Sequence, residues 1–191
     1  MTARRRIVVY GATGSGKTTL GRRLAAELGL RHIELDALYH GPNWTPATPD
    51  EFVSRIEAAV AASHQGWVAD GNYGVARPVL LPRADTVIWL RLPWRVSYWR
   101  MLTRTLRRFL TREELWNGNR ETARLLLFDK DSLLLWGIRQ HRPSQERIRA
   151  ALSEIPHQAE VIEARSSREV DALLRRLREE SRPGREEGQA S

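Results

Sequence analysis

The chain has 191 residues, of which 41% are hydrophobic and 28% are charged, which suits one domain with an apolar core. It has no cysteine and no apolar run near the ~18 residues that cross a bilayer, which excludes disulfides, thiolate zinc sites, cysteine nucleophiles and membrane spans. We therefore expect a cytoplasmic protein. The net charge of +8 comes nearly all from arginine and suggests anionic partners, although a coding bias toward arginine would give the same excess.

Short apolar runs alternate with segments of helical periodicity, the pattern of an α/β domain with a parallel sheet. In the first part of the chain, Leu20, Leu24 and Leu28 recur at four-residue spacing, and Gly29 ends their helix. The predicted elements up to residue 90 are a strand at 7–10, a helix at 17–28, a strand at 32–35, a helix that starts at 48–51 and ends before Gly66, a strand at 67–69 and a strand at 86–90.

The second part of the chain is mainly helical by its pattern. In the segment 98–110, apolar residues including Leu106 and Leu110 form one stripe, and basic residues occupy the opposite face. The elements predicted after residue 90 are a helix at 98–110, a region of helical composition at 116–137, a helix over 148–155, a strand at 161–162 and a helix at 170–177. Residues 181–191 have the composition of a disordered tail, so the sequence predicts a single domain at 1–180.

The phosphate-binding pattern G-x-x-x-x-G-K-[ST] is matched in full between the first predicted strand and the first predicted helix. Its glycines let the backbone wrap around phosphate oxygens, and the helix N-terminus presents partial positive charge to an anion. Lys17 adds a charge near the β and γ phosphates and is a catalytic candidate, and the Thr18 hydroxyl is a ligand for Mg²⁺. The sequence therefore predicts ATP and Mg²⁺ as cofactors. The predicted nucleotide-binding residues are Gly11, Ala12, Thr13, Gly14, Ser15, Gly16, Lys17, Thr18 and Thr19.

Two carboxylates follow predicted strands at the edge of the sheet where ligands gather in this class of fold. Asp70 fits a Walker B acid that holds Mg²⁺ or its waters, although an Asp-Gly pair is also a common turn. Asp36 could accept the proton of an attacking hydroxyl or orient that hydroxyl, although it could also cap a turn. The predicted substrate-binding residues are Asp36, Asp70, Gly71, Tyr73 and Arg77.

Arginines could stabilise the charge that spreads over the transferred phosphoryl group. Arg100 and Arg104 lie one helical turn apart after the fourth predicted strand, where P-loop kinases carry a lid, and we take both as catalytic candidates. The alternative is a solvated basic face. Arg77 could clamp an anionic or polar acceptor, or could simply lie at the surface before Pro78.

Several segments in this order resemble the adenylate-kinase-like P-loop proteins known as topology modulation proteins. They are the phosphate loop, Leu35–Leu38, Asp70–Tyr73 and the arginine-rich helix that follows the fourth strand. The resemblance covers roughly residues 5–178. It implies a three-layer α/β nucleoside/nucleotide kinase fold with a five-stranded parallel sheet of order 2-3-1-4-5 and a helical, arginine-bearing lid. It also implies ATP as the phosphoryl donor.

The sequence departs from true adenylate kinases after the third strand. Those enzymes have Asp-Gly-Phe-Pro-Arg there, whereas this chain has Asp70-Gly71-Asn72-Tyr73, which argues against AMP as the acceptor. We therefore expect an ATP-dependent phosphotransferase that acts on a small hydroxyl or phosphate acceptor whose identity the sequence leaves open. The alternatives are an NTPase or switch protein without an acceptor, and a nucleic-acid-associated regulator. No DNA-reading module is recognisable, so no specific nucleic acid is expected.

Overall fold

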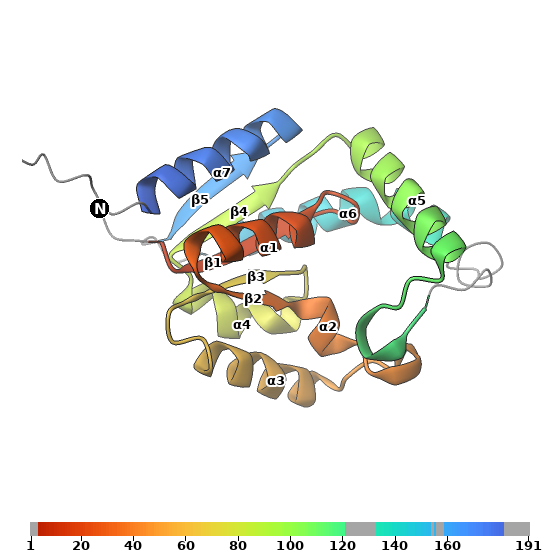
Figure 1. The fold of residues 1–191 in the computed structure, drawn as a ribbon, viewed down its shortest axis with the longest axis horizontal. Helices are drawn as coiled ribbons and strands as arrows, with labels where there is room; N and C mark the ends of the chain where they lie inside the picture. Colours follow the sequence, from red (N-terminus) through yellow and green to blue (C-terminus); the bar gives the residue numbers. More distant parts are fainter. Residues whose placement is uncertain (1–3, 121–132, 154, 156–158, 182–191) are drawn as a thin grey trace, which may run out of the picture.

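The computed structural model describes residues 4–120, 133–153, 155 and 159–181 (Figure 1). Five parallel strands form one sheet in the order β2-β3-β1-β4-β5, which the family resemblance implied. The central strands are buried along most of their length, which explains why they read as continuous apolar runs rather than as alternating ones. The strands are β1 (Arg6–Gly11), β2 (Arg31–Glu34), β3 (Trp67–Asp70), β4 (Thr86–Leu90) and β5 (Glu160–Ala164).

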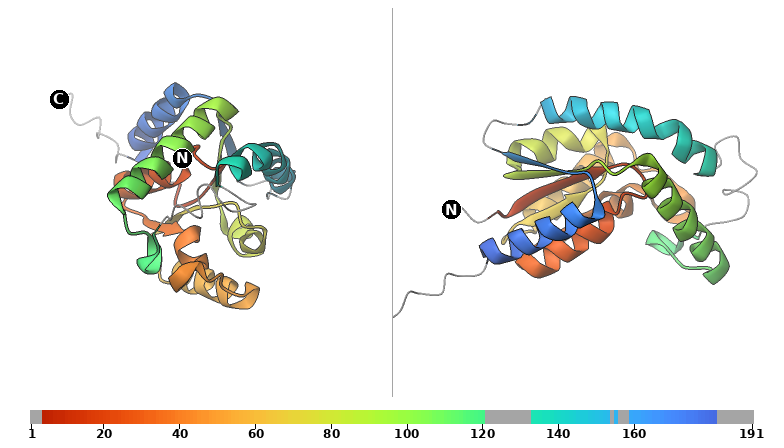
Figure 2. Two further views of the ribbon diagram at one scale, coloured as in Figure 1. Left: turned by 90° about the vertical axis from the view of Figure 1, so that its right-hand side faces the viewer. Right: turned by 90° about the horizontal axis from the view of Figure 1, so that it is seen from above.

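Helices cover both faces of the sheet and make a three-layer domain (Figure 2). One apolar cluster joins α1 and α7 to the sheet, and the other joins α3, α4 and α6 to its opposite face. None of the helices in the described part of the chain is both long and apolar enough to span a membrane. The helices are α1 (Lys17–Leu28), α2 (Leu35–Tyr39), α3 (Pro49–Ala61), α4 (Arg77–Leu80), α5 (Trp94–Thr111), α6 (Leu133–Ser153) and α7 (Ser167–Ser181).

The strand register brings the predicted site residues to one edge of the sheet. Asp70 on β3 pairs with Val9 on β1 and with Glu34 on β2, so these three strands end almost level. Because the strands are parallel, the segments that follow them all leave from the same edge. The phosphate loop after β1 therefore lies beside the acids that follow β2 and end β3.

The structure corrects the predicted position of one acid. The sequence pattern extended the second strand to Leu35 and placed Asp36 directly after it, whereas β2 ends at Glu34. Asp36 lies in the first turn of the short helix α2. A carboxylate in a first turn is favoured by the partial positive charge of a helix N-terminus. The correction moves Asp36 onto a helix but keeps it at the same edge of the sheet.

The predicted faces of the arginine-rich helix were partly wrong. α5 begins at Trp94, four residues before the predicted start, and the residues that it buries are Ser97, Met101 and Thr105. Leu106 and Leu110, which belonged to the predicted apolar stripe, are 52% and 70% exposed. The buried face of α5 approaches the phosphate loop closely, with Ser97 and Met101 next to Gly14.

The predicted helical region at 116–137 is only partly open to test. Its first residues, Trp116–Gly118, form a single turn of 3₁₀ helix, and α6 begins at Leu133. Residues 121–132 lie outside the described part of the chain, as does the predicted tail apart from Ser181, which ends α7.

Two loops on the side of α2 are fastened together. Asn119 accepts a 2.8 Å hydrogen bond from the Trp44 backbone N–H and donates one of 2.9 Å to the Gly41 carbonyl. The His40 ring stacks on Trp116 with 6.2 Å between centroids and 16° between planes. We call this set of contacts, made by residues 40–44 and 116–119, the aromatic clasp. It ties the loop after α2 to the segment after α5.

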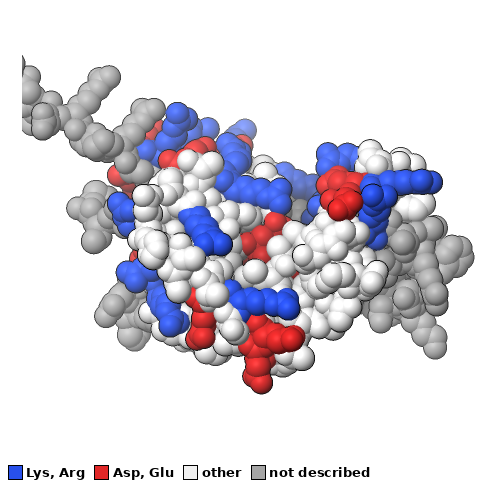
Figure 3. All heavy atoms as spheres, turned by 60° about the horizontal axis from the view of Figure 1, so that its bottom comes forward, with Lys and Arg blue, Asp and Glu red and all other residues white. Residues whose placement is uncertain are grey.

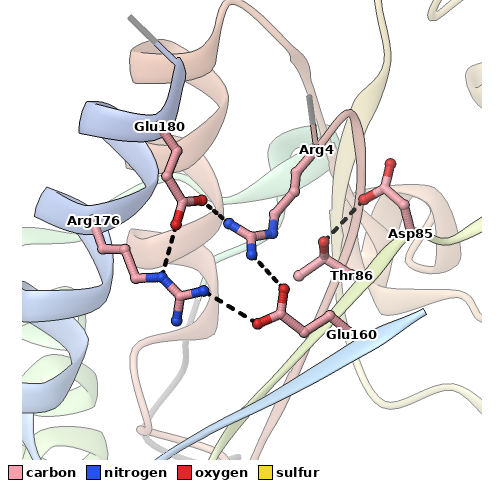
Figure 4. Close-up of polar contacts among 6 residues, drawn as sticks. All are labelled: Arg4, Asp85, Thr86, Glu160, Arg176 and Glu180. Atoms are coloured by element: carbon pink, nitrogen blue, oxygen red, sulfur yellow. Dashed lines mark hydrogen bonds and ion pairs between the residues drawn. The ribbon is translucent and has the colours of Figure 1, made fainter. Parts of the chain in front are cut away.

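Ion pairs fasten α7 to the edge of the sheet where the strands begin, opposite the predicted site (Figure 4). Arg4, just before β1, pairs with Glu160 on β5 and with Glu180 on α7. Arg176 reaches the same two carboxylates at 3.3 and 2.8 Å. Because these side chains are partly exposed, their contribution is that of a small surface network and not of a buried pair.

Candidate active site

The phosphate loop forms a tight turn between β1 and α1. The Ser15 backbone N–H donates a 3.0 Å hydrogen bond to the Ala12 carbonyl. Gly14 and Gly16 have φ angles of 78° and 93°, in the left-handed region that favours glycine. A Cβ atom on Gly14 would lie 2.0 Å from the Ser97 carbonyl oxygen of α5. Glycine is therefore required there for its backbone conformation and for the close approach of α5.

Of two polar side chains in this loop, Ser15 is closed off from solvent and Lys17 lines a cavity. Ser15 is 2% exposed, and within the described residues its Oγ has no hydrogen-bond partner. Lys17 Nζ donates to the Ala12 carbonyl at 3.2 Å, and burial lowers the pKa of its ammonium group. A buried ammonium group with a single acceptor is costly, and phosphate oxygens would supply it with further acceptors. The loop therefore fits a polyphosphate.

Asp70 joins the loop to the neighbouring strands. Thr18 Oγ1 donates a 2.8 Å hydrogen bond to Asp70 Oδ1, and His32 Nε2 donates one of 2.6 Å to Asp70 Oδ2. The carboxylate is 2% exposed. Mg²⁺ is usually held by one or two carboxylate or hydroxyl oxygens together with phosphate oxygens and waters. Thr18 and Asp70 thus fit a metal that arrives with a nucleotide, and no group of three or more acidic or histidine side chains in the described residues could hold a metal alone.

Asp36 faces the phosphate loop from α2. The Tyr73 hydroxyl donates a 2.7 Å hydrogen bond to Asp36 Oδ1. Burial and the Asp36 charge both raise the pKa of Tyr73, so the phenol stays protonated and remains a donor. In turn, the Asp36 charge raises the pKa of Lys17 against the larger effect of burial. Carboxylate and ammonium are therefore electrostatically linked across the site.

One cavity of about 290 Å³ lies between the phosphate loop, α2, α5 and α6. Lys17 and Asp36 both line it, and so does Gly71, where a Cβ atom would lie 2.8 Å from Leu35. Arg77 and Arg147 add positive charge to its wall, and Arg77 Nη2 donates to the Arg147 carbonyl at 2.9 Å. The cavity can hold a small polar molecule between a carboxylate and two guanidinium groups.

A second hollow of about 350 Å³ lies on the other side of the loop, between α5 and the start of α7. Arg100 and Arg104 line it together with Thr19. Arg100 Nη2 donates a 2.9 Å hydrogen bond to Ser167 Oγ. Arg104 is close enough to Lys17 that its charge helps to lower the pKa of that lysine. The two hollows meet at the phosphate loop, so a nucleotide could approach from one and an acceptor from the other.

Comparisons with known proteins agree with this architecture. No protein-family model matches the chain. A shikimate kinase from Moorella thermoacetica (strain ATCC 39073 / JCM 9320) is 33% identical over an alignment that covers 45% of this chain and 57% of that protein. The chain thus aligns with little more than half the length of this curated relative.

Solved structures extend the likeness over the whole domain. The shikimate kinase from Bacteroides thetaiotaomicron is 18% identical, covers 93% of this chain and 98% of its own, and superposes with a TM-score of 0.52. A shikimate kinase from Acinetobacter baumannii in complex with shikimate is 18% identical over 91% of this chain and 90% of its own, with a TM-score of 0.52. The chain has the fold of the P-loop kinases.

Within this P-loop kinase fold, the predicted site residues fall into separate groups. The first group lines the first cavity and consists of Lys17, Asp36, Gly71, Tyr73 and Arg77. Asp70, which the sequence also suggested for substrate binding, does not line the first cavity and is hydrogen-bonded to Thr18 and His32. Arg100 and Arg104 line the second hollow rather than the first cavity.

Several residues of the candidate site were missed by the sequence reasoning. Arg147 comes from α6, and nothing in its local pattern separates it from other surface arginines. Ser97 is 2% exposed, lines the first cavity and has no hydrogen-bond partner for its Oγ in the described residues. His32 was missed because its position depends on the strand register, in which Asp70 pairs with Glu34, and residues two apart on a strand share a face. That parity places His32 on the same face of the sheet as Asp70.

Proposed function

We propose that this protein is an ATP-dependent kinase that transfers the γ-phosphoryl group to a hydroxyl of a small, negatively charged acceptor. The observation that carries the proposal is that Lys17 of the phosphate loop and Asp36 of α2 line one cavity. A group that neutralises phosphate and a group that can accept a proton therefore face the same small volume. The fold shared with shikimate kinases agrees with this reading.

On the donor side, the residues of the loop would bind the triphosphate. The loop amides would donate to phosphate oxygens, and Lys17 would supply a full positive charge. Thr18 and Asp70 would hold Mg²⁺, whose chemistry is to neutralise charge on the phosphate oxygens. Arg104, near Lys17, is the candidate for stabilising charge during transfer.

On the acceptor side, Asp36 would orient the hydroxyl and take its proton. A bond forms between the acceptor oxygen and the γ phosphorus, and the bond from that phosphorus to the β,γ-bridging oxygen breaks. ADP leaves with the electron pair of the broken bond, and the proton of the hydroxyl passes to the Asp36 carboxylate. Tyr73 keeps this carboxylate oriented through its 2.7 Å hydrogen bond.

The two arginines in the wall suggest the class of acceptor. Arg77 and Arg147 would pair with a carboxylate or phosphate on the acceptor while its hydroxyl points to Asp36. A hydroxy acid meets both requirements. The names of the relatives make shikimate the first compound to try. The narrower assignment to the topology modulation proteins rests on the sequence segments at 35–38 and 70–73, and a cytoplasmic location likewise stays a prediction from the sequence.

The other functions considered have less support. A switch protein needs no acceptor site, yet the Asp36 cavity lies beside the loop. A nucleic-acid regulator would favour a continuous basic stripe. On the face shown in Figure 3, Lys and Arg side chains are instead scattered, with acidic side chains among them.

The test is an assay of ADP release with ATP and Mg²⁺ and a panel of acceptors that includes shikimate, other hydroxy acids, sugars, nucleosides and nucleotides. We expect one hydroxy acid to raise turnover well above the rate without acceptor. Lys17→Ala sets the background. Stimulation by no acceptor above that background would replace the kinase proposal with a switch protein.

A further inference from the structure

We propose that His32 is a positioning residue for the metal-binding pair Thr18 and Asp70. It would fix the Asp70 carboxylate so that Oδ1 stays turned toward the Thr18 hydroxyl, and it would thereby set how tightly the metal–nucleotide complex binds. The inference rests on the proposed function, because it concerns the metal that accompanies ATP. It adds a residue of β2 to a site otherwise built from β3 and α1.

The geometry gives the Asp70 carboxylate one donor for each oxygen. Thr18 Oγ1 reaches Oδ1 at 2.8 Å, and His32 Nε2 reaches Oδ2 at 2.6 Å. A carboxylate held at both oxygens cannot rotate about its Cβ–Cγ bond without breaking a hydrogen bond. At 2% exposure Asp70 has almost no water to replace a lost donor. Removing the imidazole would therefore free the carboxylate to turn away from Thr18.

The neighbouring helix leaves room for this imidazole. Gly21 lies inside α1, where glycine is a poorer helix former than alanine, and its φ is not in the positive range that would require glycine. A Cβ atom at this position would lie 2.9 Å from His32 Nε2 and 3.3 Å from Asp70 Oδ2. The glycine thus serves to give the His32–Asp70 pair its space, one turn away from the metal-binding Thr18.

A positioning role and a purely structural role predict different results. Outer hydrogen-bond partners of metal ligands typically change metal affinity by about 10- to 100-fold when they are removed. A purely structural pair would lower the melting temperature and leave the metal dependence of nucleotide binding unchanged. The ratio of ATP affinity with metal to ATP affinity without metal is therefore the informative quantity.

The experiment measures ATP binding by calorimetry, once with Mg²⁺ and once with EDTA, for the wild type, His32→Ala, His32→Gln and Gly21→Ala. Mn²⁺ in place of Mg²⁺ allows the bound metal to be counted by electron paramagnetic resonance. His64→Ala, at an exposed histidine between α3 and β3, is the matched control. Thermal unfolding of each variant reports whether it folds.

We expect His32→Ala to lose about 10-fold or more of the metal-dependent gain in ATP affinity, with little change in metal-free binding. Gly21→Ala should act in the same direction because its methyl group displaces the ring. His32→Gln keeps an N–H donor and should retain part of the gain, which keeps the proposal testable if His32→Ala does not fold. The inference would be overturned if His32→Ala kept the metal-dependent gain in ATP affinity of the wild type, or if His32→Gln and Gly21→Ala both kept it. Either result would leave the proposed function standing. Failure of the wild type to bind ATP with metal would overturn the proposed function as well.

Discussion

The hydroxyl of Tyr73 is bonded to the carboxylate of Asp36 at 2.7 Å, although the two residues come from different segments of the acceptor side. Tyr73 follows β3, and Asp36 lies on α2. The ring of Tyr73 also packs on Tyr39 and Phe52, with centroids 4.8 and 5.0 Å apart. The phenol is thus fixed by aromatic packing, and it fixes the carboxylate that would receive the acceptor's proton.

Replacing the acid tests this assignment. Asp36→Asn keeps the shape and the Tyr73 contact but cannot accept a proton, so we expect kcat to fall by about 10²- to 10⁴-fold. ATP affinity should not fall, because Asp36 lies outside the phosphate loop and its negative charge opposes the approach of phosphate. Tyr73→Phe should cause a smaller loss, since the carboxylate remains but is less well oriented. Steady-state kinetics with the acceptor found in the panel would check both, and near-normal kcat in Asp36→Asn would remove Asp36 from the chemistry.

The phosphate loop tolerates no side chain at Gly14. Gly14→Ala places a Cβ atom 2.0 Å from the Ser97 carbonyl oxygen at a φ of 78°, so both crowding and backbone strain oppose it. We expect a loss of about 2–5 kcal/mol in the free energy of unfolding and loss of measurable ATP binding.

Gly29 offers a matched control for Gly14. It has a φ of 64°, but nothing lies within 4 Å of its added Cβ atom. Gly29→Ala should therefore lose only about 1–2 kcal/mol, from the left-handed backbone alone, and keep ATP binding. Chemical denaturation and calorimetry measure both quantities. Equal effects of the two substitutions would show that α5 does not press on the loop in solution.

The lowered pKa of Lys17 predicts an alkaline limit to nucleotide binding. Burial lowers this pKa below its ordinary value of 10.5, with a smaller contribution from Arg104, and the charges of Asp36 and Asp70 oppose the shift. As the pH rises through the lowered pKa, the ammonium loses its proton and its attraction for phosphate. ATP affinity should therefore fall at a pH below 10.5. Calorimetry between pH 7 and pH 10 would measure the fall.

Lys17→Arg is the control for that measurement, because a guanidinium stays charged throughout the range. Its ATP affinity should be weaker overall but should lack the alkaline fall. A fall of the same size in Lys17→Arg would assign the pH dependence to another group.

The parts of the site that the sequence could predict are those that lie together along the chain. The phosphate loop carries its glycines, lysine and threonine within eight consecutive residues, and the strand before it and the helix after it fix its role. The alternation of elements predicted a parallel sheet, and the order of its strands followed from the family resemblance. Which face of α5 is buried could not be predicted, because periodicity shows that a helix has two faces but not which of them meets the loop.

Contacts between segments that are distant in the sequence were the main features that the sequence could not predict. The His32–Asp70 and Asp36–Tyr73 bonds depend on strand register and on where β2 ends. An error of one residue at that end placed Asp36 directly after a strand instead of in the first turn of a helix. Arg147 required the placement of α6 across the cavity, which no local pattern contains.

The aromatic clasp should make the folded protein less stable at mildly acidic pH than at neutral pH. Burial lowers the pKa of His40 below its ordinary value of 6.5, against a smaller opposing effect of Asp36. The unfolded chain then takes up a proton before the folded one does. The contribution of His40 is therefore fully present above pH 6.5 and is lost as the pH falls through the interval down to the lowered pKa.

His40→Phe isolates this contribution, because it keeps a ring against Trp116 and Trp44 but cannot be protonated. Among the described residues, His40 Nδ1 has no hydrogen-bond partner, so the substitution removes no bond at that atom and should leave stability at pH 7.5 within about 1 kcal/mol. Between pH 7.5 and pH 5, the wild type should lose more free energy of unfolding than His40→Phe does. Urea denaturation followed by tryptophan fluorescence measures the difference, and parallel pH profiles for the two proteins would mean that His40 is protonated as readily in the folded state as in the unfolded one.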